Sequence, residues 1–233
     1  MSTGNFCTGI LPISKPKGST SFNLVSILRR LTGIRTIGHA GTLDPFADGV
    51  MILLIGKQYT KLSNQFLNQD KEYIADARLG IATDTYDTEG QITSTSDLVP
   101  TLEQIQATLL QFQGTILQYP PMFSAKKVGG KKLYELARKG ITIEREAVPV
   151  TVHIELLSYT YPSLKFKVKS SKGTYIRSLA HDIGNTLGCG AHLSSLTRTR
   201  SGNFSLEHCC DGALLNDISY DWMKYLQSSL PCT

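Results

Sequence analysis

Hydrophobic residues recur along the chain with two spacings, one typical of helices and one typical of strands. Apolar residues at helical spacing follow a Pro/Gly turn and predict a first helix with Ser21 as its N-cap: Phe22, Val25, Leu28 and Leu31. The uninterrupted apolar run Val50–Ile55 predicts a buried strand. Residues 37–49 contain three glycines and a proline without periodicity, so we expect a loop that leads into that strand.

The remaining patterns mix strands and helices without regular alternation. They predict strands at 73–79, 150–159 and 164–168, and helices at 102–112, 133–137 and 176–187. Thr101 and Gln104 form a capping-box pattern, and Gly140 ends the short basic helix before it. Lys165 and Lys167 alternate with apolar residues and are expected on one exposed face. This mixture predicts an α+β fold.

Length and composition place the chain among globular proteins with a sizeable core. It has 233 residues, of which 41% are hydrophobic and 18% charged. No apolar run approaches the roughly 18 residues of a membrane span, and Met1–Gly9 lacks the pattern of a secretory signal. We therefore expect a cytoplasmic protein without membrane association. The five cysteines show no pairing pattern and are expected to be reduced.

Positive charge is concentrated in two segments. Residues 122–152 contain seven basic and three acidic side chains, and residues 163–202 contain seven basic and one acidic. The whole chain has a formal charge of only +5, so the remainder is acidic. Such segregation favours a surface for a polyanion such as nucleic acid, although an ordinary solvated face would have the same composition.

The loop Gly38–Gly49 is the densest candidate for chemistry, because it contains one imidazole and two carboxylates among small residues. Pro45 biases the preceding Asp44 toward extended backbone, which suits either a catalytic carboxylate or ordinary turn chemistry. A carboxylate in a closed pocket needs a cationic partner, and Arg177 is the candidate. The neighbouring Tyr175 could stack on a base. A surface arginine and a core tyrosine are the alternatives.

The sequence contains candidate metal ligands but no standard metal or nucleotide motif. Two pairs of residues with N or S ligands are separated by fifteen residues, as in some zinc sites: Cys189 with His192, and His208 with Cys209. Their spacing departs from the usual zinc pattern, and the acidic segment 83–90 lacks the closing glutamate of a calcium loop. No phosphate-cradling glycine motif occurs, so we expect neither nucleoside triphosphates nor dinucleotides as cofactors.

Several separated motifs together resemble the TruB-type family of tRNA pseudouridine synthases. The resemblance spans roughly residues 9–206. The motifs are Ser14-Lys15-Pro16, Gly38-His39-Ala40-Gly41-Thr42-Leu43-Asp44-Pro45, Tyr73 before Ala77-Arg78-Leu79-Gly80, Asp84 with Asp87 and Gly90, Pro121-Met122-Phe123-Ser124-Ala125, Gly130-Lys131-Lys132-Leu133-Tyr134, Ser171-Lys172-Gly173-Thr174-Tyr175-Ile176-Arg177, and Leu187-Gly188-Cys189-Gly190-Ala191-His192.

The resemblance implies roles for individual residues in forming pseudouridine from uridine-55 of the tRNA T-loop without metal or cofactor. Asp44 matches the catalytic aspartate, Arg177 the arginine that pairs with it, and Tyr73 a stacking tyrosine with a proton-transfer role. The residues that match substrate-binding or loop-supporting positions are His39, Tyr175, Leu196, Lys15, Lys131 and Lys132. The chemical route of glycosidic cleavage is left open.

The resemblance also implies the organisation of the chain. We expect a pseudouridine synthase catalytic domain over residues 1–206, with a mainly antiparallel mixed sheet, flanking helices, a central cleft and an RNA-gripping lobe at 122–152. Residues 207–233 are expected to be a short tail without a separate RNA-binding domain, with Trp222, Tyr225 and Leu226 docked on the protein. The expected partner is the T-arm of tRNA, and the expected state is a monomer. The alternative function is a non-catalytic RNA-binding or RNA-folding module.

Overall fold

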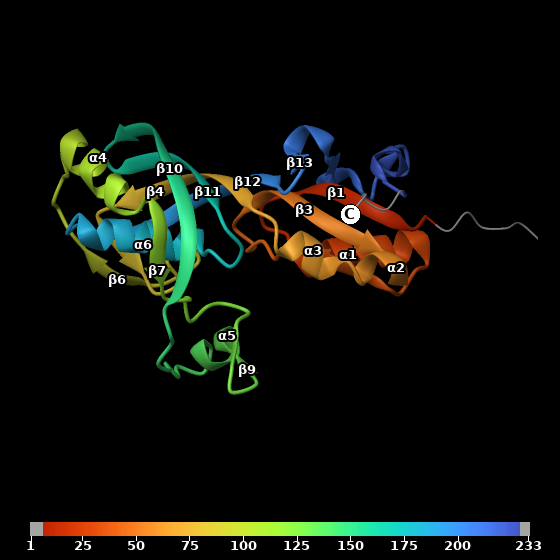
Figure 1. Cartoon of the computed structure of the whole chain (residues 1–233), viewed down its shortest axis with the longest axis horizontal. Helices are drawn as coiled ribbons and strands as arrows, with labels where there is room; N and C mark the ends of the chain where they lie inside the picture. The colour runs from red at the N-terminus through yellow and green to blue at the C-terminus, as the bar shows by residue number, and fades with distance from the viewer. Residues whose placement is uncertain (1–6, 229–233) are drawn as a thin grey trace, which may run out of the picture. The chain divides into compact units, whose positions relative to one another are not determined.

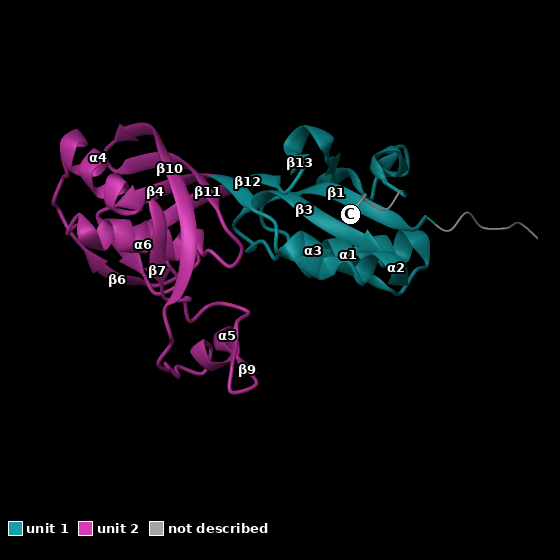
Figure 2. Ribbon diagram, in the orientation of Figure 1, with its two compact units in different colours: residues 1–73, 197–233 teal, residues 74–196 magenta. Residues whose placement is uncertain are grey.

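The chain divides into two compact units, residues 1–73 with 197–233, and residues 74–196 (Figure 2). The computed structural model describes residues 7–228, so Cys232 lies outside the described residues. Two strands begin in one unit and end in the other: β4 (Lys71–Leu79) and β12 (Ala191–Ser201). The single catalytic domain over residues 1–206 therefore stays a prediction.

Unit 1 is a mixed sheet with helices and single-turn 3₁₀ segments around it (Figure 1). Its strands follow the order β14–β1–β3–β12–β4, and β2 and β13 pair with β3 and β12. Besides the two shared strands, its elements are β1 (Gly9–Lys15), α1 (Ser21–Thr32), β2 (Ile37–Ala40), β3 (Asp48–Ile55), α2 (Lys57–Thr60), α3 (Ser63–Leu67), β13 (Phe204–Ser205), η1 (Leu206–His208), β14 (Cys210–Asp211), η2 (Gly212–Leu214) and η3 (Trp222–Tyr225).

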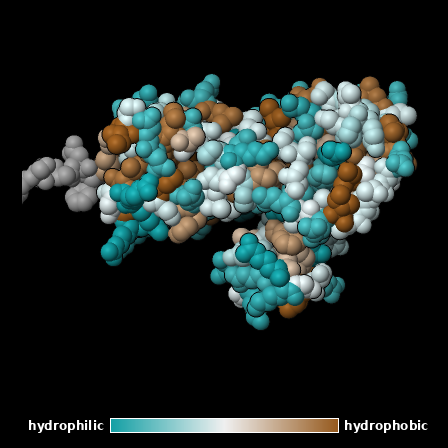
Figure 3. Space-filling view, turned by 180° about the vertical axis from the view of Figure 1, so that it is seen from behind, coloured by the Kyte–Doolittle hydropathy of each residue, from teal (hydrophilic) through white to brown (hydrophobic). Residues whose placement is uncertain are grey.

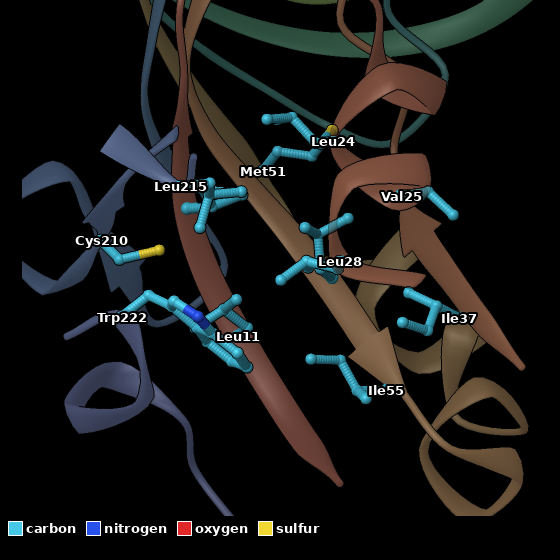
Figure 4. Close-up of a cluster of buried hydrophobic side chains, with 12 residues drawn as sticks. Leu11, Leu24, Val25, Leu28, Ile37, Met51, Ile55, Cys210, Leu215 and Trp222 are labelled. Carbon is cyan, nitrogen blue, oxygen red and sulfur yellow. The ribbon is translucent and has the colours of Figure 1, made fainter. Parts of the chain in front are cut away.

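Strand β3 is buried on both of its faces, which explains the uninterrupted apolar run in the sequence. Met51, Leu53 and Ile55 pack with α1 and with the segment that follows residue 209 (Figure 4). Val50, Ile52 and Leu54 form a second cluster on the opposite face, together with aromatic residues of α2 and α3. The predicted buried strand is confirmed.

The C-terminal segment is part of unit 1. Strand β14 pairs with β1 in parallel, and Trp222 is only 8% exposed within the same apolar cluster as β1 and α1 (Figure 4). Tyr225 and Leu226 pack against that cluster as partly buried neighbours. The prediction that these three side chains dock on the protein is confirmed.

Unit 2 is a sheet in the order β12–β4–β11–β10–β7, with helices α4 and α6 beside it (Figure 1). Helix α4 contacts both β10 and α6. In addition to β4 and β12, its elements are β5 (Ile81–Thr83), β6 (Ile92–Thr95), α4 (Leu102–Gln111), β7 (Gly114–Gln118), β8 (Lys127–Val128), β9 (Lys131–Lys132), α5 (Leu133–Ala137), β10 (Val148–Thr160), β11 (Ser163–Ser170) and α6 (Ile176–Thr186).

The segment between β7 and β10, residues 119–147, is called the lobe below, and it overlaps the predicted lobe at 122–152. It contains the β8–β9 hairpin and α5, and its surface is largely hydrophilic (Figure 3). Only Leu133 of α5 is fully buried. Gly140 follows α5 with a φ of 70°, which agrees with the predicted helix stop.

The α+β class and most predicted elements are confirmed, including the capping box of Thr101 and Gln104. Two local predictions are wrong. The N-cap of α1 is Thr20, whose side chain accepts from the amide of Asn23, because Ser21 is buried and bonds elsewhere. Residues Ile37–Ala40 form strand β2 on β3, where the glycines and proline of that segment predicted only a loop.

In the part of the chain that the structure describes, none of the helices has the length and apolar content needed to cross a membrane.

Candidate active site

Asp44 lies in unit 1 on a loop, residues 41–47, that joins β2 to β3, and its side chain is half-buried. The loop is fixed at its centre by Ser21 of α1. The amide of Leu43 donates to Ser21 Oγ at 3.1 Å, and that hydroxyl donates to the Leu43 carbonyl at 3.2 Å. Both bonds are buried, so they hold the residue before Asp44 against the first helix.

Lys15 supports the loop from the end of β1. Its side chain is fully buried, and its ammonium donates to the carbonyls of Ser19 at 2.7 Å, Pro16 at 3.1 Å and Pro45 at 3.4 Å. The carbonyl of Pro45 also accepts from the amide of Gly18 at 2.7 Å. This arrangement agrees with support of the aspartate loop, and a direct contact between Lys15 and substrate stays a prediction.

Arg198 of β12 holds the start of the loop, at Gly41. The sequence did not predict this role of Arg198. Its side chain is 1% exposed, and it donates from Nη2 to the Gly41 carbonyl at 3.0 Å and from Nε to the Val50 carbonyl at 2.6 Å. Gly49 pairs with Arg198, and a Cβ on Gly49 would lie 2.3 Å from the Arg198 carbonyl oxygen. Only glycine allows the two strands to approach this closely.

A third buried cation, Lys71 of β4, lies near Arg198. Its ammonium donates to the carbonyls of Phe66, Leu67 and Gln69. Burial, followed by the charge of Arg198, lowers the pKa of Lys71 to about 8. The loop that carries Asp44 is thus surrounded by positive charge that is bound to backbone carbonyls.

His39 and Tyr73 lie on neighbouring parts of unit 1. His39 is in β2, opposite Leu53 of β3, and is half-buried. Burial and the charge of Arg198 lower the pKa of His39, which favours the neutral imidazole. Its Nδ1 atom has no hydrogen-bond partner among residues 7–228. Tyr73 is the third residue of β4 and is 8% exposed.

Arg177 lies in unit 2, in the first turn of α6, and is 4% exposed. Its guanidinium donates from Nη1 to the Thr85 carbonyl and from Nη2 to the Phe123 carbonyl, each at 2.8 Å. Nη1 also lies 3.5 Å from Oδ2 of Asp87, which is equally buried. Arg177 is therefore buried beside a carboxylate, that of Asp87, whose pairing with this arginine was not predicted from the sequence.

Asp87 is held in place by its own turn. Its Oδ1 accepts from Thr85 Oγ1 at 2.6 Å and from the Glu89 amide at 3.0 Å. A buried charge needs such bonds on each oxygen, and the second oxygen faces Arg177. The predicted pairing of Arg177 with Asp44 stays a prediction, because the two residues belong to different units.

The other predicted site residues of unit 2 lie near the start of α6 and in the lobe. Tyr175 is the N-cap residue of α6, and its amide and carbonyl bond the side chain of Gln118 at 2.7 and 3.0 Å. Leu196 is buried in β12. Lys131 is exposed and Lys132 half-exposed on β9, where the Lys132 ammonium lies 5.4 Å from the ring centre of Tyr134.

Within residues 7–228, no group of three or more His, Cys, Asp or Glu side chains is placed to hold an ion. His192, one of the considered zinc ligands, instead bonds the Ile81 carbonyl through Nδ1 at 2.8 Å. Burial raises the pKa of Cys209 and of Cys210 to about 12, and that of Cys189 above its usual value. At neutral pH these thiols are therefore protonated, which makes them poor nucleophiles.

Two of the missed residues had a signal in the sequence. Arg198 stands two residues after Leu196 in a strand, so both side chains point to the same, buried face. Asp87 belongs to a Thr-rich turn that is both the rejected calcium loop and one of the family motifs, but neither reading gave it a role. Ser21 carried no signal, because its role depends on contacts with the distant Leu43. Lys71 bonds carbonyls of the turn just before it, and no motif marked that turn.

Relatives that share one name match this chain over most of its length. A tRNA pseudouridine synthase B of Protochlamydia amoebophila is 63% identical over 211 residues, which is 91% of this chain and 80% of that protein. The protein of the same name from Chlamydia trachomatis serovar L2 is 55% identical, over 95% of this chain and 92% of its own length.

Solved structures also resemble this chain. The structure of a Cbf5-Nop10-Gar1 complex matches with 28% identity and a TM-score of 0.71 over 95% of this chain. An H/ACA RNP bound to a substrate RNA containing 2′-deoxyuridine matches with 27% identity and a TM-score of 0.68. The chain spans about three fifths of the length of each matched chain.

Family models cover the chain almost completely. Residues 29–176 match the N-terminal domain of the TruB family pseudouridylate synthases, and residues 177–231 match the C-terminal domain of tRNA pseudouridylate synthase B. The first match alone extends over more than half of the 233 residues and includes the loop with Asp44. The chain therefore belongs to the TruB family of pseudouridylate synthases.

Proposed function

We propose that this protein is a tRNA pseudouridine synthase that converts uridine-55 in the T-loop of tRNA to pseudouridine. The observation that carries the proposal is the half-buried Asp44 on a loop whose backbone is held by Ser21, Lys15 and Arg198. A carboxylate in such a loop keeps its position when a substrate arrives, which a catalytic group requires. A relative named tRNA pseudouridine synthase B is 63% identical, which supports the proposal.

The reaction breaks the bond between C1′ of the ribose and N1 of uracil, and forms a bond between C1′ and C5. The proton on C5 must then leave, and N1 gains one, so atoms balance without a co-reactant. We assign the start of cleavage to Asp44, by attack on the sugar, attack on the base or deprotonation of the sugar. Tyr73 would stack on the uracil and transfer the proton, and Arg177 would stabilise the carboxylate.

Access to the uridine requires that it leaves its stack in the folded T-loop, at a cost of a few kcal/mol. Tyr175, Leu196 and His39 are proposed to hold the everted nucleotide, and Lys131 and Lys132 of the lobe to bind the phosphate backbone. We propose that the protein acts as a monomer in the cytoplasm, where its tRNA substrate is found, and requires no metal or cofactor.

The test incubates purified protein with an unmodified tRNA transcript, without added metal, and maps pseudouridine in the product. We expect modification at position 55, and none in a transcript with cytidine there. Asp44→Asn is expected to abolish turnover while tRNA binding stays within a few-fold of wild type, because the amide preserves the shape of the side chain. Turnover near the wild-type rate in this variant would refute the assignment. Binding without turnover in the wild type would favour the alternative, a non-catalytic RNA-binding module.

A further inference from the structure

Gln118, the last residue of β7, makes two hydrogen bonds to the backbone of one residue, Tyr175 at the start of α6. Its side-chain oxygen accepts from the Tyr175 amide at 2.7 Å, and its side-chain nitrogen donates to the Tyr175 carbonyl at 3.0 Å. Because a backbone amide only donates and a carbonyl only accepts, the pair allows one orientation of the Gln118 amide. Gln118 is 1% exposed, so the pair is shielded from solvent.

The backbone of Gln118 is itself held by the sheet. Gln118 pairs with Val148 in the ladder between β7 and β10, at the end of β7 where the lobe begins (Figure 1). A further bond supports the same connection, because the hydroxyl of Ser178 in α6 donates to the carbonyl of Tyr119 at 3.3 Å. A side chain that extends from a paired strand is placed more precisely than one on a loop. Gln118 therefore attaches the start of α6 to a fixed part of unit 2.

The position of the Tyr175 ring depends on the Tyr175 backbone. Within residues 7–228, the hydrogen bonds of Tyr175 are made by its backbone, to Gln118 and to Leu179. Its side chain is half-buried and does not cap α6. A tyrosine side chain has only two rotatable angles, so a shift of the backbone is passed on to the ring. Loss of the Gln118 amide would therefore free the ring to move.

We propose that Gln118 is a positioning residue of the pseudouridine-forming reaction, which holds the Tyr175 ring at the everted uridine by fixing the Tyr175 backbone. The proposal rests on the proposed function, because that function assigns the everted nucleotide to Tyr175. A displacement of about 1 Å in a group that orients the substrate can cost roughly 100-fold in rate. The effect is expected on turnover more than on affinity, since contacts with phosphates supply much of the binding of a nucleic acid.

Gln113 offers a matched control in the same unit. It directly precedes β7, and its side-chain amide bonds the amide and the carbonyl of Ile154 at 3.0 and 2.6 Å. The two glutamines therefore border the same strand and make the same kind of bond pair. Ile154 lies in β10, which contains none of the predicted site residues. Loss of the Gln113 amide should disturb the fold in a similar way without moving Tyr175.

The test compares Gln118→Met with Gln113→Met in the full-length protein, because methionine is close to glutamine in length and lacks the amide. Both substitutions leave two backbone groups without a partner, so both are expected to lower the melting temperature. For Gln118→Met we expect kcat on tRNA to fall at least about 10-fold, with KM within about two-fold of wild type. Gln113→Met is expected within about two-fold of wild type in both constants.

Circular dichroism at the assay temperature establishes that each variant is folded. Gln118→Asn, whose amide is one methylene group too short to reach Tyr175, replaces Gln118→Met if the latter unfolds.

A double-mutant cycle measures whether Gln118 acts through Tyr175. In Tyr175→Ala the ring is already absent, so adding Gln118→Met is expected to lower the single-turnover rate by less than about three-fold. Tyr175→Leu takes the place of Tyr175→Ala if the rate of the latter is too low to follow.

Equal kcat values for Gln118→Met and Gln113→Met, or an undiminished effect of Gln118→Met in the protein without the Tyr175 ring, would overturn the proposal. If the wild type itself forms no pseudouridine, the proposed function fails, and that result is distinct from both of these.

Discussion

Arg177 shows how much the shape of one side chain contributes beyond its charge. Its two terminal nitrogens bond carbonyls on two different segments, and Nη1 also faces the buried carboxylate of Asp87. The planar guanidinium reaches the two carbonyls and the carboxylate at once, whereas the single ammonium of a lysine cannot.

Arg177→Lys is expected to lose most of the turnover, at least about 10-fold in single-turnover rate, because the lysine keeps a charge but cannot hold both carbonyls. Pseudouridine formation under single-turnover conditions measures this, and a thermal melt measures the accompanying loss of stability. A rate equal to that of wild type would show that the fork geometry has no role in the reaction.

Asp182, also on α6, gives a prediction about pH. Burial raises the pKa of Asp182 to about 6, whereas the same carboxyl in an unfolded chain titrates near 4. Between about pH 4 and pH 6 the folded state therefore binds more protons than the unfolded state. The free energy of unfolding falls as the pH rises through this range, and it stays lower above pH 6.

Asp182→Asn is therefore expected to melt at a higher temperature than wild type at pH 8, with the difference vanishing below pH 4. Thermal melts across this range check it, with the exposed Asp97→Asn as the matched control. A difference between Asp182→Asn and wild type that does not change with pH would contradict the assigned titration.

Ser21 connects helix α1 to the loop that carries Asp44 by hydrogen bonds. The hydroxyl makes two buried bonds to Leu43, whereas Ser26 on the same helix is exposed and bonds only the carbonyl of Phe22. The two serines therefore form a matched pair on one helix.

Ser21→Ala leaves the Leu43 amide and carbonyl without their partner, which costs about 1–3 kcal/mol in the free energy of unfolding. We expect kcat to fall more than KM rises, since the loop loses its position rather than its contact with RNA. Denaturant unfolding and steady-state kinetics measure both effects, with Ser26→Ala as the control. Equal effects of the two substitutions would show that the loop does not depend on Ser21.

Most helices and strands could be predicted from the sequence, but the tertiary contacts that hold them together could not. The apolar run 50–55 and the alternation at 164–168 predicted strands because each pattern depends only on local burial. Strand β2 was missed because its pairing with β3 is a tertiary contact that overrides a glycine-containing segment. Ser21 and Arg198 were missed as parts of the candidate site because each bonds backbone that is distant in the sequence. Strand alternation placed Arg198 on the buried face but could not show which carbonyls it bonds.

At the scale of the whole molecule, the lobe concentrates positive charge in a segment whose side chains mostly face solvent. Lys127 and Lys131 are exposed there, and hydrophilic residues cover the visible face of the lobe (Figure 3). Exposed lysines that neutralise phosphates release counterions, so their contribution depends on salt.

Lys131→Ala is expected to weaken binding of tRNA at low salt and to lower the slope of log K against log salt by about 1, the value for one lost phosphate contact. Filter binding over a series of salt concentrations measures the slope. Lys57→Ala on α2, an exposed lysine outside both basic segments, is the matched control. A reduction of equal size there would show that the loss does not come from a phosphate contact of the lobe.

Strands β4 and β12 are neighbours, and the chain leaves unit 1 along one and returns along the other. Residues 74–196 thus behave as an insertion whose two ends are already next to each other. Excision would leave a gap that a short connector closes at little entropic cost, and the excised piece would be suited to circular permutation. Topology of this kind is what permits a chain to acquire or exchange an entire segment without re-threading the rest.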